Sequence, residues 1–266
     1  FHAVQGRVGN YSWAKIGLQH WMNKLHGRIA VSALALESVQ RHFGGDYSVI
    51  PNSIDVDHFA KSADPIPELL DGRTNLLFVG RLERRKGLRY LLQAFARLKW
   101  DYPELRLLVV GPGNPDKESY RVLGEHNLKD VVFLGGVSYR DLPRYYQAAH
   151  IFCSPATGKE SQGLVLLEAM AAGKAIVASN IAGYASVLSY GAQGLLVPPR
   201  DPLALAEALG YLLDNPALRY ELEKRVVVQA QLFRREKIAQ QVLSVYENAI
   251  TRKLTRPNIA PMPFTP

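Results

Sequence analysis

Short, almost wholly apolar runs recur along the chain from Asn75 onward, and longer amphipathic segments separate them. Runs without polar alternation are typical of strands that are buried on both faces of a sheet. Strands that alternate with helices in this way predict an α/β fold with a parallel, doubly wound sheet. The expected strands are residues 75–80, 106–111, 131–136, 151–155, 175–179 and 194–198.

The segments between these strands show the periodicity of helices. Residues 88–98 place apolar side chains at the i, i+3, i+4, i+7 spacing of an amphipathic helix. Residues 141–150 and 163–173 are also expected to be helical, with Gly173 as a C-cap. Three further helices are predicted near residues 201–214, 216–232 and 236–252.

The first 54 residues do not continue this succession. A helix over 13–26 and short strands over 27–32 and 47–52 predict the end of a preceding α/β domain, followed by a linker. Because the chain opens with Phe1 and not with methionine, we expect that sequence precedes it. The expected parts are 1–54, the end of an N-terminal domain with the linker; 55–235, a Rossmann-like domain; 236–252, a C-terminal helix returning toward the N-terminal domain; and 253–266, a flexible tail.

Composition limits the possible partners. The formal net charge of +8 suits nucleotide phosphates, an acidic membrane surface or nucleic acid, although a solvated basic surface is the simpler alternative. The single cysteine, Cys153, excludes an intrachain disulfide, and its apolar run predicts a buried thiol in a reducing, cytoplasmic compartment. No run approaches the roughly 18 apolar residues of a membrane span, and no signal peptide is predicted.

Ligands of open parallel sheets bind beyond the carboxyl ends of the strands. The first turn at that edge, residues 80–87, has Arg81 directly after a strand and Lys86 at the start of a helix. Two cations beside helix N-terminal N–H groups predict an anion site that suits a diphosphate, with a solvated basic loop as the alternative. The turn lacks the Gly-Lys-Ser/Thr sequence of a Walker loop.

The next two turns carry weaker signals. Residues 111–113 begin like a dinucleotide fingerprint, but Asp116 stands where the third glycine belongs, so a tight turn is the better interpretation. The turn over 135–138 offers open backbone groups near Val137 that could read the edge of a base.

The turn before the helix over 163–173 carries two carboxylates. Glu168 interrupts an otherwise apolar helix, where a buried carboxylate is costly without a hydrogen-bonding partner. A ribose diol and a core arginine are the two candidate partners. Glu160 precedes the helix and is expected to hold sugar hydroxyls, while the N–H groups around Gly163 and Leu164 form a second candidate phosphate site.

The same two glutamates could instead be the acid and base of a hydrolase. Eight helical residues would separate them by ~12 Å at 1.5 Å per residue. Glycosidase carboxyl pairs lie roughly 5–9.5 Å apart. The expected geometry therefore favours two contacts with one extended ligand over an acid–base pair.

Four stretches of the chain resemble one enzyme family. They are GRIAVS (27–32), IPNSIDVDHF (50–59), FVGRLERRKG (78–87) and ESQGLVLLEAMAAGKAIVAS (160–179). From Phe1 to about Ile250 the chain is similar to glycosyltransferase family 4, and within it to members that transfer mannose to phosphatidylinositol-type lipids.

The resemblance implies a GT-B architecture with two Rossmann-like domains, transfer with retention of configuration, and no required metal or other cofactor. The donor would be a nucleotide-diphosphate sugar, either GDP-mannose or a UDP-hexose, and the acceptor a lipid or a glycan. The same relatives imply a cytoplasmic protein with peripheral association at an anionic inner membrane surface, and no nucleic-acid partner.

The family's site residues can be carried over by position. Arg81 and Lys86 would hold the donor diphosphate, and Glu168 the ribose. Glu160 would contact the transferred sugar, and no residue is assigned as catalytic. The other expected donor contacts are Gly80 in the first turn, the Val137 backbone near the base, and the backbone amides of Gly163 and Leu164.

The chain departs from the family pattern in three respects. Gln162 replaces a residue that is commonly apolar, which matters little if the contacts there are backbone ones, and Ser53 replaces a glycine of the linker turn. The family's glycine-rich loop and catalytic histidine in the N-terminal domain have no counterpart, and His2 is not taken for that histidine. We therefore expect this polypeptide alone to bind donor weakly and to turn over little or not at all.

Two other classes of protein are alternatives. A sugar-nucleotide epimerase shares the GT-B architecture but needs acid–base residues that the turn over 159–163 does not obviously supply. A non-catalytic nucleic-acid-binding module would use the interleaved Arg140, Arg144, Tyr145 and Tyr146, although helical spacing also allows these tyrosines to be core residues.

Overall fold

The computed structural model describes residues 17–60 and 64–255. Their contacts group them into two compact units. The larger unit runs from Asn52 to Arg235, and the smaller unit combines residues 17–51 with residues 236–255. The chain therefore passes between the units twice, after Pro51 and after Arg235.

A parallel sheet forms the centre of the larger unit. Within the described residues, six strands pair in the order β5-β4-β3-β6-β7-β8. In chain order this is the 3-2-1-4-5-6 arrangement of the Rossmann fold, and the direction of succession reverses between β3 and β6. The strands are β3 (Thr74–Val79), β4 (Leu105–Val110), β5 (Val131–Gly135), β6 (Ile151–Ser154), β7 (Ala175–Ser179) and β8 (Leu195–Val197).

This sheet confirms the predicted α/β class and the doubly wound, parallel arrangement. Each of the six strands expected from residue 75 onward forms, with its ends within one residue of the predicted run. Burial on both faces holds for the central strands but is wrong for β5, where Phe133 is 40% exposed. The reason is that β5 stands at an edge of the described sheet and pairs with β4 alone.

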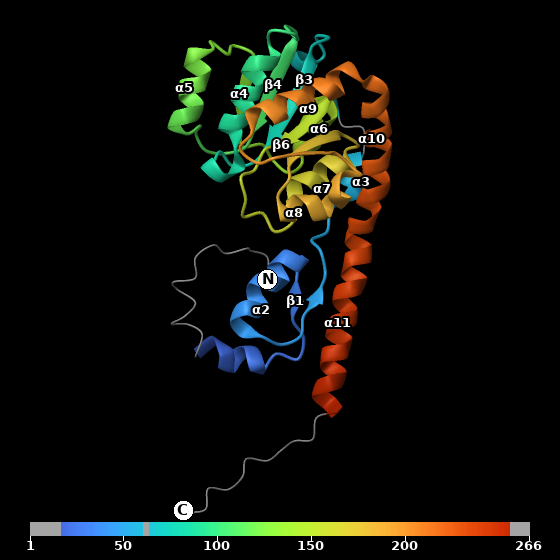
Figure 1. The fold of residues 1–266 in the computed structure, drawn as a ribbon. Helices are drawn as coiled ribbons and strands as arrows, with labels where there is room; N and C mark the ends of the chain where they lie inside the picture. Colours follow the sequence, from blue (N-terminus) through green and yellow to red (C-terminus); the bar gives the residue numbers. More distant parts are fainter. Residues whose placement is uncertain (1–16, 61–63, 256–266) are drawn as a thin grey trace, which may run out of the picture. The chain divides into compact units, whose positions relative to one another are not determined.

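Helices lie on both faces of the sheet (Figure 1). They are α3 (Val56–Ala60), α4 (Leu88–Leu98), α5 (Lys117–Glu125), α6 (Leu142–Ala148), α7 (Leu164–Ala171), α8 (Ala182–Val187), α9 (Pro202–Asp214) and α10 (Pro216–Ala230). The helix predicted over 88–98 forms with the expected bounds. Three of these helices, α3, α5 and α8, were not predicted: α3 and α8 are short, and α5 is a polar segment whose buried residues are Ser119 and Val122.

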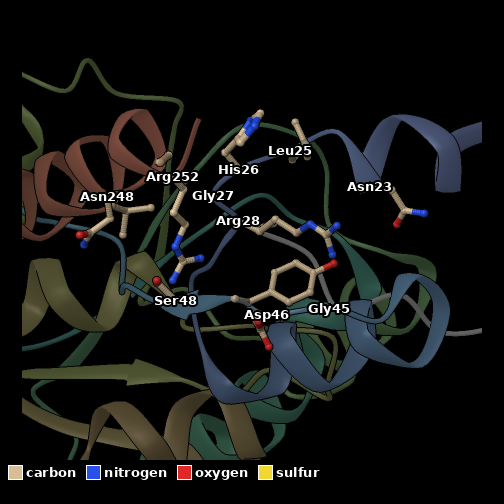
Figure 2. Close-up of a pocket in the computed structure, with 13 residues that line it drawn as sticks. Asn23, Leu25, His26, Gly27, Arg28, Gly45, Asp46, Ser48, Asn248 and Arg252 are labelled. Atoms are coloured by element: carbon tan, nitrogen blue, oxygen red, sulfur yellow. The ribbon is translucent and has the colours of Figure 1, made fainter. Parts of the chain in front are cut away.

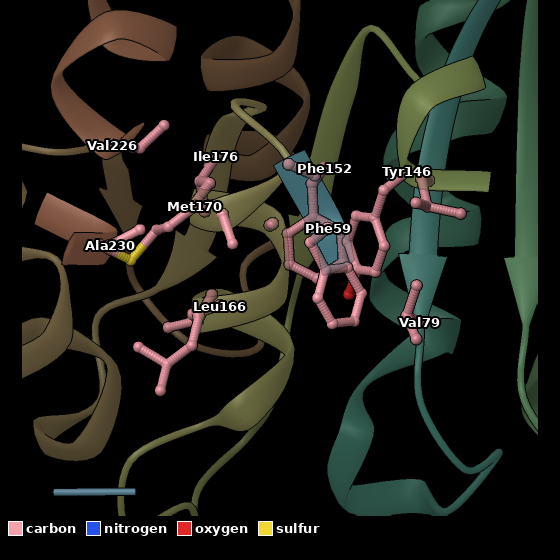
Figure 3. Close-up of a cluster of buried hydrophobic side chains, with 14 of the residues drawn as sticks. Phe59, Val79, Tyr146, Phe152, Leu166, Met170, Ile176, Val226 and Ala230 are labelled. Carbon is pink, nitrogen blue, oxygen red and sulfur yellow. The ribbon is translucent and has the colours of Figure 1, made fainter. Parts of the chain in front are cut away.

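Alternate residues of each strand enter two separate cores. Leu77 and Val79 face one core, which packs against α3, α6, α7, α8 and α10 (Figure 3). Leu76 and Phe78, from the same strand, face the other core, which packs against α4, α5 and α9. Because both faces are covered, the strands are apolar at successive positions. Cys153 is fully buried in the second core, as its apolar run predicts.

The segments of the larger unit that adjoin these two passages, called here the first and the second crossing, lie side by side. Ile54 N donates a hydrogen bond to Phe233 O at 2.8 Å, and Ile54 forms a parallel bridge with Arg234. Arg235 Nη1 also lies 3.0 Å from Asp55 Oδ2. The segment that enters the larger unit is thus bonded to the segment that leaves it.

The smaller unit contains a short parallel pair, β1 (Ile29–Ala30) with β2 (Ser48–Val49), and the intervening helix α2 (Ala33–Phe43). Residues 17–23 are helical, within the helix expected over 13–26. Helix α11 (Arg235–Thr255) includes residues 253–255, which were assigned to the tail. His2 and tail residues 256–266 lie outside the described residues.

Candidate functional site

The turns after β3 and β6 meet at the point where the strand order reverses. Residues Arg84–Lys86 form a 3-10 turn that ends at Gly87, whose φ is +78°. A Cβ at Gly87 would lie 1.9 Å from the Pro155 carbonyl oxygen, so the close approach of the two turns requires glycine there. Thr157 N donates to Arg85 O at 2.8 Å, which joins the turns directly.

Glu160 lies among the cations of the first turn. Lys86 Nζ is 2.8 Å from Glu160 Oε1, and Arg85 donates a hydrogen bond to the same oxygen. The Lys86 and Glu160 side chains are largely buried, at 14% and 11% exposed. The structure therefore brings Lys86 and Glu160 together, and the two predicted turns form one site.

Arg81 is placed differently from Lys86. Its side chain is 64% exposed and lies 3.0 Å from Glu83 Oε1. Glu83 Oε2 also accepts a hydrogen bond from Arg85 Nε at 2.7 Å, so an ion-paired chain runs from Arg81 through Glu83 and Arg85 to Glu160. Sequence reasoning missed Arg85. The run of three basic residues was the available signal, but the direction of each side chain depends on the 3-10 turn.

Glu168 lies on α7, partly buried, and accepts a hydrogen bond from the Tyr146 hydroxyl at 2.8 Å. The partner in the free chain is thus a phenol, and not the core arginine that was one of the two expectations. Burial raises the pKa of Glu168, while the Tyr146 hydrogen bond and the charge of Lys86 oppose the rise. Tyr146 is fully buried in the core, which makes its ring unavailable for stacking on a nucleic-acid base.

The start of α7 changes the expected spacing of the two glutamates. The helix begins at Leu164, and Gly163 precedes it in a left-handed conformation. Glu160 therefore lies before the helix, and the ~12 Å estimate, which assumed helical rise over all eight residues, does not apply. The charge of Lys86 acts on Glu168 as well as on Glu160, so both carboxylates belong to one electrostatic site.

The remaining predicted residues lie in neighbouring turns. Gly80 N donates to Val110 O at 2.9 Å, which fixes the start of the first turn. Val137 is partly buried, in the connection between β5 and α6. In that connection, burial raises the pKa of Tyr139, with Arg235 opposing and Asp55 and Glu168 adding to the rise. The charge of Glu168 therefore acts weakly on this connection as well.

The turn over 111–113 packs against the first turn and does not form a dinucleotide fingerprint. Leu82 N donates to Pro112 O at 3.0 Å. Asp116, at the position of the expected third glycine, is the N-cap of α5 and accepts from Ser119 N at 2.8 Å. The prediction of a tight turn is confirmed.

The smaller unit contains a cavity of its own, of about 620 Å³ (Figure 2). Arg28 is among its lining residues and donates to the Gly44 carbonyl oxygen at 2.9 Å. None of the predicted site residues lines this cavity.

The described part of the chain contains neither a candidate metal cluster nor a helix that could span a membrane. No three His, Cys, Asp or Glu side chains gather there in an arrangement that could hold a metal ion. None of the helices described is both long and apolar enough to cross a bilayer.

A family model described as "Glycosyl transferases group 1" matches residues 61–232. This span covers well over half of the chain and falls within the larger unit. The chain belongs to this family. The match confirms the resemblance to glycosyltransferase family 4 that the sequence motifs indicated.

Two characterised types of glycosyltransferase are similar in sequence to this chain. A phosphatidyl-myo-inositol mannosyltransferase of Mycobacterium leprae is 38% identical over 238 residues, covering 88% of this chain and 62% of that protein. A D-inositol 3-phosphate glycosyltransferase of Pseudarthrobacter chlorophenolicus is 31% identical over 229 residues, covering 79% of this chain and 53% of that protein. The chain thus spans about three fifths of the first relative's length and about half of the second's.

Among solved structures, Anabaena HepE in complex with UDP has a similar fold. The two structures superpose with a TM-score of 0.83 at 21% identity, covering 92% of this chain and 70% of HepE. Together with the strand order, this likeness confirms the expected fold class, a Rossmann-like domain of GT-B type.

Proposed function

We propose that the chain is the donor-binding part of a glycosyltransferase that moves a hexose from a nucleotide-diphosphate sugar to a lipid or glycan acceptor. The observation that carries the proposal is the convergence of Lys86 and Arg85 on Glu160, where the strand order reverses. Cations that are already collected at this edge of a Rossmann-like sheet suit a diphosphate.

Each part of the donor has a candidate partner. Lys86, Arg85 and the backbone amides of Gly163 and Leu164, at the N-terminus of α7, would hold the diphosphate. Glu168 would accept hydrogen bonds from the ribose hydroxyls, and the Val137 backbone would lie near the base. When the diphosphate takes over its cations, Glu160 would turn to the hydroxyls of the transferred sugar.

The transfer is proposed to retain the anomeric configuration and to need no metal. Fixed cations and helix N-terminal amides would offset the charge of the leaving diphosphate, which is the work that a metal does in other transferases. The names of the similar proteins support mannose or another hexose as the sugar, and an inositol-containing lipid or inositol phosphate as the acceptor. GDP-mannose is the first donor to test and UDP-glucose the second, since HepE was solved with UDP.

We also propose peripheral association of the full-length protein with an anionic membrane surface at the cytoplasmic side. The net charge of +8 supports it. Co-sedimentation with vesicles that contain an anionic lipid should occur at low salt and weaken as salt rises. Equal recovery with neutral vesicles would contradict the proposal.

The deciding experiment is a ligand panel on the chain itself. Thermal stability and calorimetric binding would be measured with GDP, UDP, ADP, GDP-mannose and UDP-glucose, each with and without a chelator. One base should stabilise the chain, the chelator should change nothing, and Glu168→Ala should weaken binding. Glu207→Ala, an exposed glutamate on α9, is the matched control.

Three outcomes would reject the proposal. The first is that no nucleotide stabilises the chain, and the second is that Glu168→Ala binds as the wild type does. The third is a salt-dependent stabilisation by DNA or RNA without any by nucleotides, which would favour the nucleic-acid module. Conversion of the sugar nucleotide to its epimer, without an acceptor, would favour the epimerase.

A further inference from the structure

Gln162 is a buried polar side chain in the turn that carries Glu160. It lies between Ser161 and Gly163 and is 3% exposed. A buried amide is costly unless its polar atoms are hydrogen-bonded, so its partners show what the residue does.

Both strong bonds of Gln162 go to one residue far away in the sequence. Its Oε1 accepts from Asn52 N at 2.7 Å and from Asn52 Nδ2 at 2.8 Å. Its Nε2 lies 3.5 Å from Asn52 O. Asn52 is the first residue of the larger unit, at the start of the first crossing.

The segment around Asn52, to which Gln162 is hydrogen-bonded, is itself held in place by further bonds. Two residues after Asn52, Ile54 is bonded to Phe233 and bridged to Arg234 of the second crossing. The amide of Gln162 therefore attaches the turn to a supported segment and not to a loose loop.

The same turn is held on two other sides. Its backbone packs against α8 so closely that a Cβ at Gly183 would lie 2.0 Å from the Glu160 carbonyl oxygen. The Glu160 side chain is held by Arg85 and Lys86. Of these three attachments, the Glu160 ion pairs are the ones that an incoming diphosphate would disturb, whereas the Gln162 bonds involve only uncharged groups.

We propose that Gln162 is a positioning residue, which holds the turn against Asn52 while the ion pairs of Glu160 exchange for the donor. This inference rests on the proposed function, in which Glu160 and the amides at the start of α7 contact the sugar-phosphate end of the donor. Gln162 acts through the turn and does not itself touch the donor. Its loss should therefore impair recognition of the sugar, which depends on Glu160, more than binding of the nucleotide, which keeps its proposed contacts with Lys86 and Glu168 outside the turn.

The test compares two dissociation constants for each variant, one for the nucleoside diphosphate and one for its sugar conjugate. The probes are UDP with UDP-glucose or GDP with GDP-mannose, whichever pair the wild type binds. Gln162→Leu removes both strong bonds and should weaken the sugar nucleotide about tenfold but the nucleoside diphosphate less than about threefold. Asn52→Ala removes the Nδ2 bond alone and should shift the ratio in the same direction by about threefold.

Two controls separate positioning from general stability. Gln162→Glu keeps an oxygen acceptor for both Asn52 donors but replaces the Nε2 donor to Asn52 O with a second oxygen, so the ratio should recover only in part, to between those of the wild type and Gln162→Leu. Gln147→Leu removes another glutamine amide bond, from Gln147 Nε2 to Phe59 O at 3.0 Å. That variant should lower the melting temperature while leaving both dissociation constants unchanged.

A fall in stability for Gln162→Leu and Asn52→Ala with an unchanged ratio would assign Gln162 a structural role only and overturn the inference. If Gln162→Leu does not fold, the Asn52→Ala ratio decides alone. If the wild type binds none of the probes, the proposed function fails first and this inference fails with it.

Discussion

The two glutamates of the candidate site are held in different ways. Glu160, in the turn after β6, has two cationic partners in the free chain, Arg85 and Lys86. Glu168, on α7, is hydrogen-bonded by the neutral hydroxyl of Tyr146, and burial raises its pKa. An anionic ligand must compete with Glu160 for its cations, whereas Glu168 is an acceptor already in place. In the proposed site, the same residue type would therefore serve as an exchangeable counterion at one position and as a preplaced acceptor at the other.

Removal of Lys86 should have the largest effect, because this side chain acts on both glutamates. Lys86→Ala is expected to weaken nucleoside diphosphate binding about 100-fold, since a charge-assisted contact contributes roughly 1.5–3 kcal/mol and Glu160 would be left with Arg85 alone. Calorimetry measures the change. Lys129→Ala, an exposed lysine before β5, is the matched control. A loss below about threefold would place the diphosphate elsewhere.

Replacement of Glu168 should weaken nucleotide binding but raise the thermal stability of the free chain. Glu168→Gln keeps an acceptor for the Tyr146 hydroxyl but removes the buried charge. Nucleotide binding should weaken about tenfold, and the melting temperature of the free chain should rise by about 2 °C, as expected where a functional charge is held at a cost. Both changes are measured on the same preparation. A variant that binds normally would break the contrast between the two glutamates.

The stability difference between wild type and Glu168→Gln should depend on pH. Below the ordinary value of 4.5, Glu168 is protonated in both the folded and the unfolded chain and carries no penalty. Between the ordinary value of 4.5 and the raised pKa of the folded state, the unfolded chain ionises Glu168 while the folded chain keeps the proton, so the wild type loses stability relative to the variant as pH rises. Melting curves from pH 4 to pH 8 should therefore diverge as pH increases. A constant difference would contradict the raised pKa.

Replacement of Glu160 should act in the opposite direction on the bare nucleotide. Glu160→Gln frees Arg85 and Lys86 from their counterion, so UDP or GDP should bind about threefold more tightly. The sugar nucleotide should lose this advantage, because Glu160 is the proposed contact for the transferred hexose. Tighter binding of both ligands to the same degree would remove Glu160 from sugar recognition.

Arg81 should matter least among the predicted cations. Its side chain is 64% exposed, and its ion pair with Glu83 is therefore screened by solvent. Arg81→Ala is expected to change nucleotide affinity by less than about threefold at physiological salt. An effect as large as that of Lys86→Ala would mean that ligand binding draws Arg81 into the site.

Local pattern was enough to predict the sheet and most helices of the larger unit. Strands such as β3 are buried on both faces, so the successive residues Leu76–Val79 all carry the same apolar signal. The amphipathic α4 gives an equally direct signal. The polar α5 was missed because only Ser119 and Val122 are buried in it, which leaves no periodic stripe to detect.

The site was predictable only in part, because its contacts join residues that are distant in the sequence. The turns that carry Lys86 and Glu160 could be selected from their place after the strands, but their direct ion pair could not. The partner of Glu168 was open for the same reason, since Tyr146 is 22 residues away on another helix. From the sequence alone, glutamine in place of an apolar residue at position 162 is expected to matter little. In the structure, the Gln162 side chain accepts a hydrogen bond from Asn52, 110 residues away.

The bond between Ile54 and Phe233 places the two ends of the larger unit next to each other. A segment whose termini adjoin can be excised or transplanted without stretching the backbone at either cut. Residues 52–235 should therefore express as an autonomous module, and should also tolerate insertion into a surface loop of a host protein. In evolutionary terms, such a module could be exchanged between chains as a single unit.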